Sequence, residues 1–155
     1  MLRSTIFTSL LLSLLLLSET HAEGPQKPRA LPGQVEVKVS GFRSGRGQVF
    51  VALWRSDKSF PGTPPKGTPS ASVKIVKGVA TAGFRDVPPG VFAVSVFHDE
   101  DGDGELKTNF IGIPKEGIGF SRDARARFGP PGWDDAKLVL EPGEVEQVNI
   151  TMLYY

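Results

Sequence analysis

The sequence lacks cysteine entirely and has only two histidines in 155 residues. The absence of cysteine excludes disulfide bonds, a catalytic thiol, cysteine-held iron–sulfur clusters and the usual cysteine-containing zinc sites. One histidine, His21, lies in an N-terminal segment with the features of a leader, so His98 is the only imidazole expected in the mature chain. A hydrolytic triad would have to use His98 or dispense with histidine.

An excess of either charge is also missing. The chain has 18 basic and 17 acidic side chains and a formal net charge of +1, and removal of Arg3 and Glu19 with the leader leaves this value unchanged. Nucleic acids and anionic membranes attract proteins that carry an excess of basic groups. The charge balance therefore predicts neither of them as a partner.

Residues 1–22 have the pattern of a secretory signal peptide. Arg3 supplies a positive start, and the apolar run that follows is about a dozen residues long, which is shorter than the roughly 20 residues of a membrane-spanning helix. Thr20 and Ala22 place small residues before a cleavage site that follows Ala22. We expect a secreted or periplasmic protein with no membrane insertion after signal cleavage; an uncleaved anchor is the alternative.

The rest of the chain divides into a proline-containing flexible lead-in at residues 23–33 and a single domain at residues 34–155. Alternating or short apolar runs between Gly- and Pro-rich turns predict strands, and no segment of the mature chain has ten residues of helical periodicity. We therefore expect an all-β fold, an antiparallel β-sandwich of about seven strands. The predicted strands are residues 34–40, 48–54, 72–77, 79–85, 91–97, 137–140 and 145–152, and those on either side of Gly78 form a predicted hairpin.

A long connection at residues 99–135 interrupts this rhythm. Connections of this length are usually functional or disordered. Four aromatic side chains and three isoleucines are too many apolar groups for a disordered segment, so we expect one long loop that packs against the domain. The apolar residues are Phe110, Ile111, Ile113, Ile118, Phe120, Phe128 and Trp133.

The connection begins with an acidic turn. Asp99, Asp101 and Asp103 stand at alternate positions and Gly104 follows, which is the front half of a calcium-binding loop. Ca²⁺ coordinates six to eight oxygens, and alternate carboxylates in a tight loop converge on one point. Glu105 occupies the seventh loop position, where a backbone carbonyl is a ligand in helical calcium hands.

The back half of a calcium hand is missing from this turn. Phe110 stands at the twelfth position, where a helical calcium hand has its bidentate glutamate, and no helical pattern flanks the turn. Two interpretations stay open. Asp99, Asp101 and Asp103 bind Ca²⁺ with further oxygen from Glu105, Asn109 or water, or the aspartates form a solvated turn and accept hydrogen bonds from backbone amides.

Three arginines follow the acidic turn at Arg122, Arg125 and Arg127. Together with Asn109 they are candidates for binding a carboxylate, a phosphate or a sugar acid. The alternative, which the local charge balance favours, is that they pin the loop to the domain by pairing with aspartates. The candidate partners in that case are Asp99, Asp123, Asp134 and Asp135.

These segments resemble a family of exported bacterial proteins, the domain of unknown function family 2141. The resemblance is carried by Val94–Asp99, Asp101–Gly104, Thr108–Gly117, Gly119–Ser121 and Ala126–Pro131, and the run NFIGIPKEGIGFS is its most specific part. It implies a secreted or periplasmic β-sandwich domain without an established activity. The strand spacing is also similar to Ig-like and transthyretin-like sandwiches, which is a likeness of fold alone.

Two functions stay open on these grounds. The first, which we favour, is an exported non-catalytic module of unknown role that binds Ca²⁺ in its acidic turn and a protein or saccharide ligand through the Gly/aromatic/Arg loop. The alternative is a secreted hydrolase that uses carboxylates such as Asp99 and Asp134, or His98 with Ser95 or Ser121. No G-x-S-x-G motif is present, and Ser95 and His98, three residues apart on a strand, point to opposite faces.

Overall fold

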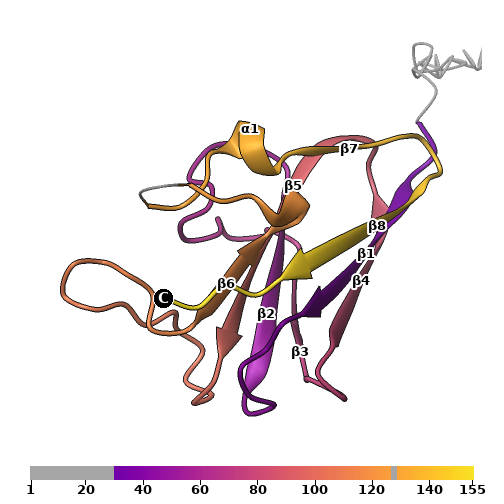
Figure 1. Cartoon of the computed structure of the whole chain (residues 1–155). Coiled ribbons are helices and arrows are strands. Elements are labelled where there is room, and N and C mark those ends of the chain that lie inside the picture. Colours follow the sequence, from indigo (N-terminus) through magenta and orange to yellow (C-terminus); the bar gives the residue numbers. More distant parts are fainter. Residues whose placement is uncertain (1–29, 127–128) are drawn as a thin grey trace, which may run out of the picture.

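The computed structural model describes residues 30–126 and 129–155 and confirms an all-β fold. Two sheets have the strand orders β4-β1-β8 and β3-β2-β5-β6, and β7 pairs with β5 (Figure 1). No helix in the described part of the chain is long and apolar enough to cross a membrane. The elements are β1 (Gly33–Ser40), β2 (Gln48–Trp54), β3 (Ser70–Val73), β4 (Ala80–Val87), β5 (Gly90–Asp99), β6 (Gly117–Phe120), the 3₁₀ turn η1 (Ser121–Asp123), α1 (Trp133–Ala136), β7 (Leu138–Leu140) and β8 (Val145–Thr151).

The alternation of buried and exposed residues explains why the strands form where they do. Val35, Val37 and Val39 are fully buried, whereas the residues between them are exposed. Every second side chain of a strand points to the same face, so one face of β1 is apolar and packs against the other sheet. The core between the sheets contains Val35, Val37, Val39, Val49, Val51, Leu53, Ala82, Phe84, Phe92, Val94, Val96, Leu140, Val148 and Ile150.

One strand pair departs from the expected antiparallel arrangement. The first and last strands, β1 and β8, are parallel, with a register that runs from Gln34 opposite Val145 to Ser40 opposite Thr151. The other paired strands are antiparallel. Alternation of apolar residues is the same in both arrangements, so the sequence pattern does not distinguish them.

The predicted hairpin around Gly78 is wrong as a strand pair. β3 pairs with β2, and β4 pairs with β1 in the other sheet. Only an isolated bridge between Val76 and Val79 spans the turn. The segment therefore crosses from one sheet to the other, because each strand buries its apolar face by pairing within a different sheet.

The long connection packs in its second half only. The elements β6, η1 and α1 contribute to a second apolar cluster on the outer face of β2 and β5. The tip of the first half of the connection projects into solvent instead. Phe110 is 98% exposed and Ile111 is 64% exposed, so the expectation that the whole loop packs is wrong at the tip. Phe128 lies outside the described residues. The second cluster contains Ala52, Trp54, Ala93, Ile118, Phe120, Ala124 and Ala136, with Phe60, Phe97, Trp133 and Leu153 at its edge.

A matched pair of valines tests the position of the core. Val51 is fully buried between the sheets, and Val145 is 49% exposed at the start of β8. We expect Val51→Ala to lower the free energy of unfolding by about 2–3 kcal/mol, because it removes two methyl groups and leaves a cavity. Val145→Ala should change it by less than about 1 kcal/mol. Equal effects in urea unfolding would contradict the assignment of the core.

Candidate functional site

The acidic turn begins at the buried end of the central strand β5. Asp99, the last residue of β5, is fully buried, and its carboxylate accepts hydrogen bonds from the backbone N–H groups of Gly102 at 2.8 Å and Gly104 at 3.1 Å. The side-chain amide of Gln48 on β2 donates a third at 2.9 Å. Gly104 has a φ of +82°, which glycine adopts without strain. The Asp99 carboxylate therefore fixes the conformation of the turn by accepting hydrogen bonds from its backbone.

The surroundings of Asp99 keep it ionised. Burial alone would raise the pKa of its carboxyl group, but the hydrogen bonds from Gln48, Gly102 and Gly104 outweigh burial, and the pKa lies below its ordinary value. The negative charge of Asp99 is therefore a permanent part of the turn at neutral pH.

Asp101 and Asp103 complete the predicted cluster of carboxylates. Both are exposed, and one oxygen from each lies within 4.8 Å of one oxygen of Asp99 and of the other. Glu105 is exposed and is not a member of this group; its backbone N–H donates to Asp103 Oδ1 at 3.0 Å. The structure thus brings together three of the four predicted metal ligands.

A lysine occupies the acidic turn. Lys107 Nζ lies 2.8 Å from Asp103 Oδ2 and also contacts Asp101 Oδ2. These pairs raise the pKa of Lys107, and hydrogen bonds from Lys107 and from the N–H of Glu105 lower the pKa of Asp103. The spacing of the aspartates does not indicate a role for Lys107, although its position four residues after Asp103 is a usable signal. The turn attracts a positive charge, and the chain provides one.

A second buried carboxylate closes the turn at its base. Glu116 is 5% exposed, and its two oxygens accept hydrogen bonds from the N–H groups of Glu100 at 3.0 Å and Lys107 at 3.1 Å. The two ends of the turn are thereby held together. Nothing in the sequence around Glu116 indicates burial, because acidic residues are rarely buried.

His98 is enclosed on the opposite face of β5. Its Nε2 lies 2.7 Å from the carbonyl oxygen of Arg46, which only accepts, so Nε2 carries the proton and Nδ1 accepts from the Tyr154 hydroxyl at 2.8 Å. Burial raises the pKa of Tyr154, which keeps this donor protonated. His98 is fully buried and both of its ring nitrogens have partners inside the protein.

The two candidate serines also make structural hydrogen bonds. Ser95 Oγ accepts from Trp54 Nε1 at 2.8 Å on the outer face, which confirms that Ser95 and His98 point to opposite faces. Ser121 Oγ is fully buried, donates to the Ala136 carbonyl at 2.6 Å and accepts from the Val94 N–H at 2.9 Å. Ser121 therefore joins β5 to α1.

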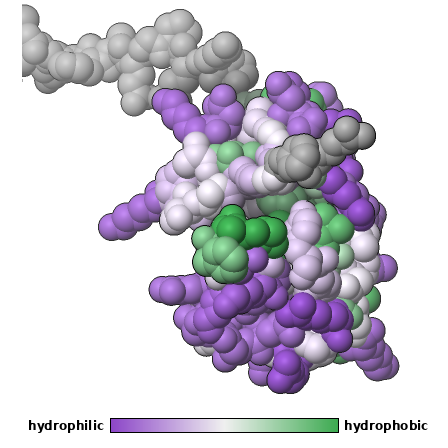
Figure 2. Space-filling view, turned by 60° about the vertical axis from the view of Figure 1, so that its left-hand side comes forward, coloured by the Kyte–Doolittle hydropathy of each residue, from purple (hydrophilic) through white to green (hydrophobic). Residues whose placement is uncertain are grey.

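After the acidic turn the chain forms a hairpin at residues 107–115. The Lys115 N–H donates to the Lys107 carbonyl at 2.9 Å. Asn109 Oδ1 accepts from the N–H groups of Ile111 at 3.0 Å and Ile113 at 2.9 Å, so this predicted ligand residue stabilises the hairpin tip. The exposed apolar side chains of the tip lie beside hydrophilic surface, and Figure 2 shows a strongly hydrophobic protrusion of this kind.

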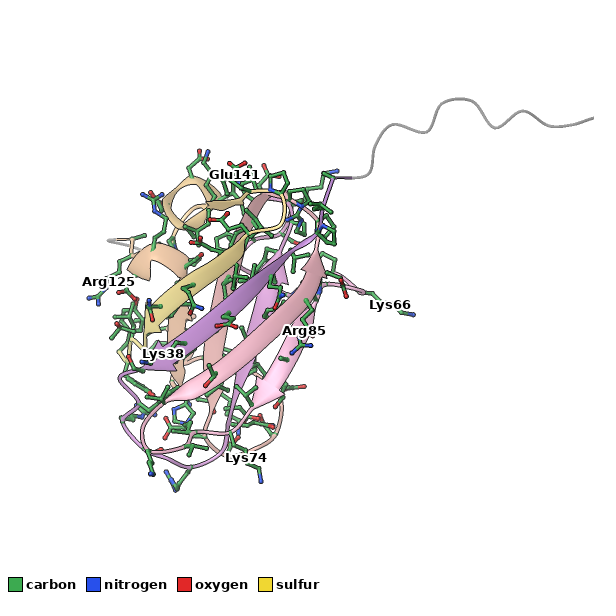
Figure 3. The ribbon with its side chains drawn as sticks, turned by 90° about the vertical axis from the view of Figure 1, so that its right-hand side faces the viewer. Lys38, Lys66, Lys74, Arg85, Arg125 and Glu141 are labelled. Atoms are coloured by element: carbon green, nitrogen blue, oxygen red, sulfur yellow. The ribbon has the colours of Figure 1, made fainter. Side chains whose placement is uncertain are left out.

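The arginine patch is only partly described. Arg122 has a φ of +61°, and its Nη1 donates a hydrogen bond to the Asp134 carbonyl oxygen at 3.4 Å. Arg125 is exposed and extends away from the domain (Figure 3). Arg127 lies outside the described residues. Among the described residues no arginine pairs with the expected aspartates. Asp123 instead accepts from the Thr151 N–H at 2.7 Å, and this contact helps to hold the loop against β8.

An open groove of about 790 Å³ lies on the outer face of β2 and β5, and the sequence did not predict it. Phe50 and Phe97 stack in its floor with ring centroids 4.8 Å apart. The loop between β2 and β3, at residues 61–68, forms one wall, and residues 104–106 of the acidic turn form the other. The groove is mainly apolar.

These features define an all-β protein with an acidic turn at the end of its central strand. The profile of the family described as "Uncharacterized protein conserved in bacteria (DUF2141)" matches residues 37–148. The chain belongs to this family, and the resemblance seen in the sequence is confirmed. Comparison with curated proteins and with solved structures gives no significant match.

The charge of Asp99 is expected to stabilise the fold. Asp99→Asn replaces an acceptor oxygen by an NH₂ group that faces backbone N–H donors, and should lower the free energy of unfolding at neutral pH by about 2 kcal/mol. Because the folded-state pKa is depressed, this contribution is present above the unfolded-state pKa of about 3.9 and is lost as the pH falls through the folded-state pKa. Urea unfolding across this range should show the difference between variant and parent shrinking towards acid.

The matched control is Asp57→Asn. Asp57 is exposed and its carboxylate has no ion pair among the described residues, so the same change there should leave stability nearly unaltered. A loss at Asp99 that stays constant down to strongly acidic pH would show that its charge is not what stabilises the turn.

Proposed function

We propose that the protein is an exported, non-catalytic β-sandwich module that binds Ca²⁺ in its acidic turn. The observation that carries this proposal is the convergence of oxygens from Asp99, Asp101 and Asp103 within 4.8 Å of one another, around a position that attracts the Lys107 ammonium. Hard cations bind clustered carboxylate oxygens of this kind. Lys107 offsets part of the negative charge of the turn in the absence of Ca²⁺ and competes with the cation.

The neighbouring contacts support a turn that is already organised for binding. Hydrogen bonds to Asp99 and Glu116 hold the backbone, so little conformational entropy remains to be lost when a cation binds. Asp101 and Asp103 supply exposed oxygens, and the twelfth position, Phe110, supplies none. A site with few protein ligands favours modest affinity, with a dissociation constant on the order of 0.1–1 mM, as in extracellular calcium modules.

The surroundings of the candidate catalytic groups support a binding role over the hydrolase alternative. His98 has no free ring nitrogen, and the Ser95 and Ser121 hydroxyls are engaged in structural contacts. The positions of Asp99 and Asp134 do not favour a hydrolase that uses these two carboxylates either. Asp99 is buried at one end of β5, whereas Asp134 lies on α1 at the other end of the sandwich, where it pairs with Lys137 (Figure 1).

Export is supported by the sequence of residues 1–22, which lie outside the described part of the chain. For the partner, the hairpin tip favours a protein over a saccharide. Phe110 and Ile111 expose hydrocarbon side chains, which cannot hydrogen-bond to sugar hydroxyls, and exposed apolar side chains gathered in one place are typical of protein interfaces.

Calorimetric titration of the exported protein with Ca²⁺ tests the calcium proposal. We expect a saturable heat and a melting temperature that rises with Ca²⁺ and returns after chelation. Asp101→Asn and Asp103→Asn should each weaken binding at least about tenfold, and Lys107→Met should strengthen it, because the competing ammonium is removed. Asp57→Asn serves as the control and should bind like the parent.

Two results would contradict the proposal. The absence of both heat and melting shift would show that the turn is a solvated one held by Lys107. Unchanged binding in Asp101→Asn and Asp103→Asn would place the cation elsewhere in the molecule.

A further inference from the structure

The hairpin tip presents an apolar knob that is largely exposed. We define the knob as Phe110, Ile111 and Ile113, which are 98%, 64% and 38% exposed. The hairpin hydrogen bonds and the Asn109 side chain hold these residues at the end of a projecting loop. Exposed apolar groups are costly in water, so a structured knob of this composition calls for an occupant of its surface.

The same molecule has an open apolar groove that the knob of its own chain does not fill. Its volume of about 790 Å³ lies within the range of about 300–1,000 Å³ typical of sites that enclose a ligand, so it has room for several side chains. The floor consists of Phe50 and Phe97 with Ala52 and Ser95 beside them. The knob does not fill this groove in its own molecule, because Phe110 is almost completely exposed.

Knob and groove lie on one side of the domain. Leu106, which is 41% exposed, lines the groove, and the hairpin that bears the knob begins at the next residue, Lys107. A surface that carries both a projection and a complementary hollow is self-complementary. When two copies meet about a two-fold axis, such a surface forms the same contact twice and closes.

Part of the negative charge near this surface is balanced by cations of the same chain. Asp101 and Asp103 are paired with Lys107, and Glu100 is paired with Arg43 at 2.7 Å. Lys107 and Arg43 thus offset part of the negative charge of the acidic turn within its own chain, which reduces the repulsion between two copies.

We propose that the partner of the knob is a second copy of this chain, and that two copies form a symmetric dimer in which each knob enters the groove of the other. The inference rests on the protein-partner part of the proposed function and is independent of calcium. The residues that carry it are Phe110 and Ile111 on one copy and Phe50 and Phe97 on the other. The dimer buries two apolar surfaces that the monomer leaves in water.

Sedimentation equilibrium of the full exported protein over a wide concentration range tests the dimer. We expect a single monomer–dimer equilibrium for the parent. Phe110→Ser should raise the dimer dissociation constant about a hundredfold, since a buried aromatic anchor is lost from both contacts. Val139→Ser, at a valine that is 56% exposed on β7, is the matched control and should dimerise like the parent.

A mixing experiment distinguishes mutual insertion from other modes of association. Ser70 is exposed and lines the groove, so Ser70→Trp should block the groove without disturbing the core. Phe110→Ser and Ser70→Trp should each be monomeric alone. When mixed they should form a heterodimer, because one intact knob then meets one open groove; this dimer should be weaker than that of the parent.

Several outcomes would overturn the inference. These are a parent that stays monomeric at all concentrations, a dimer unaffected by Phe110→Ser, and a mixture that does not associate. A monomeric parent that binds phospholipid vesicles through Phe110 would assign the knob to a membrane surface instead. Calcium titration of Phe110→Ser reads the acidic turn separately, so failure of the dimer and failure of the calcium proposal give different results.

Discussion

A carboxylate buried in a protein must have hydrogen-bond partners, and this constraint governs the end of the molecule that holds the acidic turn. Asp99 is fully buried and is satisfied by two backbone N–H groups of the turn and by Gln48 from the neighbouring strand. Glu116 meets the same need at the base of the turn. The hydrogen bonds to these two carboxylates fix the backbone of residues 99–107, and the hairpin begins where this stretch ends.

The strands and the inner core were predictable because alternation with period two is a local signal. The alternation of Val35, Val37 and Val39 with polar residues is enough to predict a half-buried strand. Sheet membership is not local, so the pattern on either side of Gly78 predicts a hairpin although the two strands belong to different sheets. The parallel pairing of β1 with β8 joins residues more than a hundred positions apart and carries no local signal either.

The carboxylates of the candidate site were predictable from the sequence, but the residues that hold and pair with them were not. The spacing of Asp99, Asp101 and Asp103 indicated converging carboxylates, and these do converge. The roles of Lys107 and Glu116 depend on how the chain returns after the turn, which residue spacing does not determine. The apolar count of the long loop predicted packing, but Phe110 stands at the tip of a hairpin, where no neighbouring element can cover it.

The parallel pairing of the first and last strands has a mechanical consequence. The chain enters the domain at the start of β1 and leaves after the end of β8, so tension between the two ends pulls these neighbours in opposite directions along their length. The ladder from Gln34–Val145 to Ser40–Thr151 is then loaded in shear, and its hydrogen bonds share the force instead of opening one at a time. A domain tethered by one end and pulled by the other would resist extension at this pair of strands.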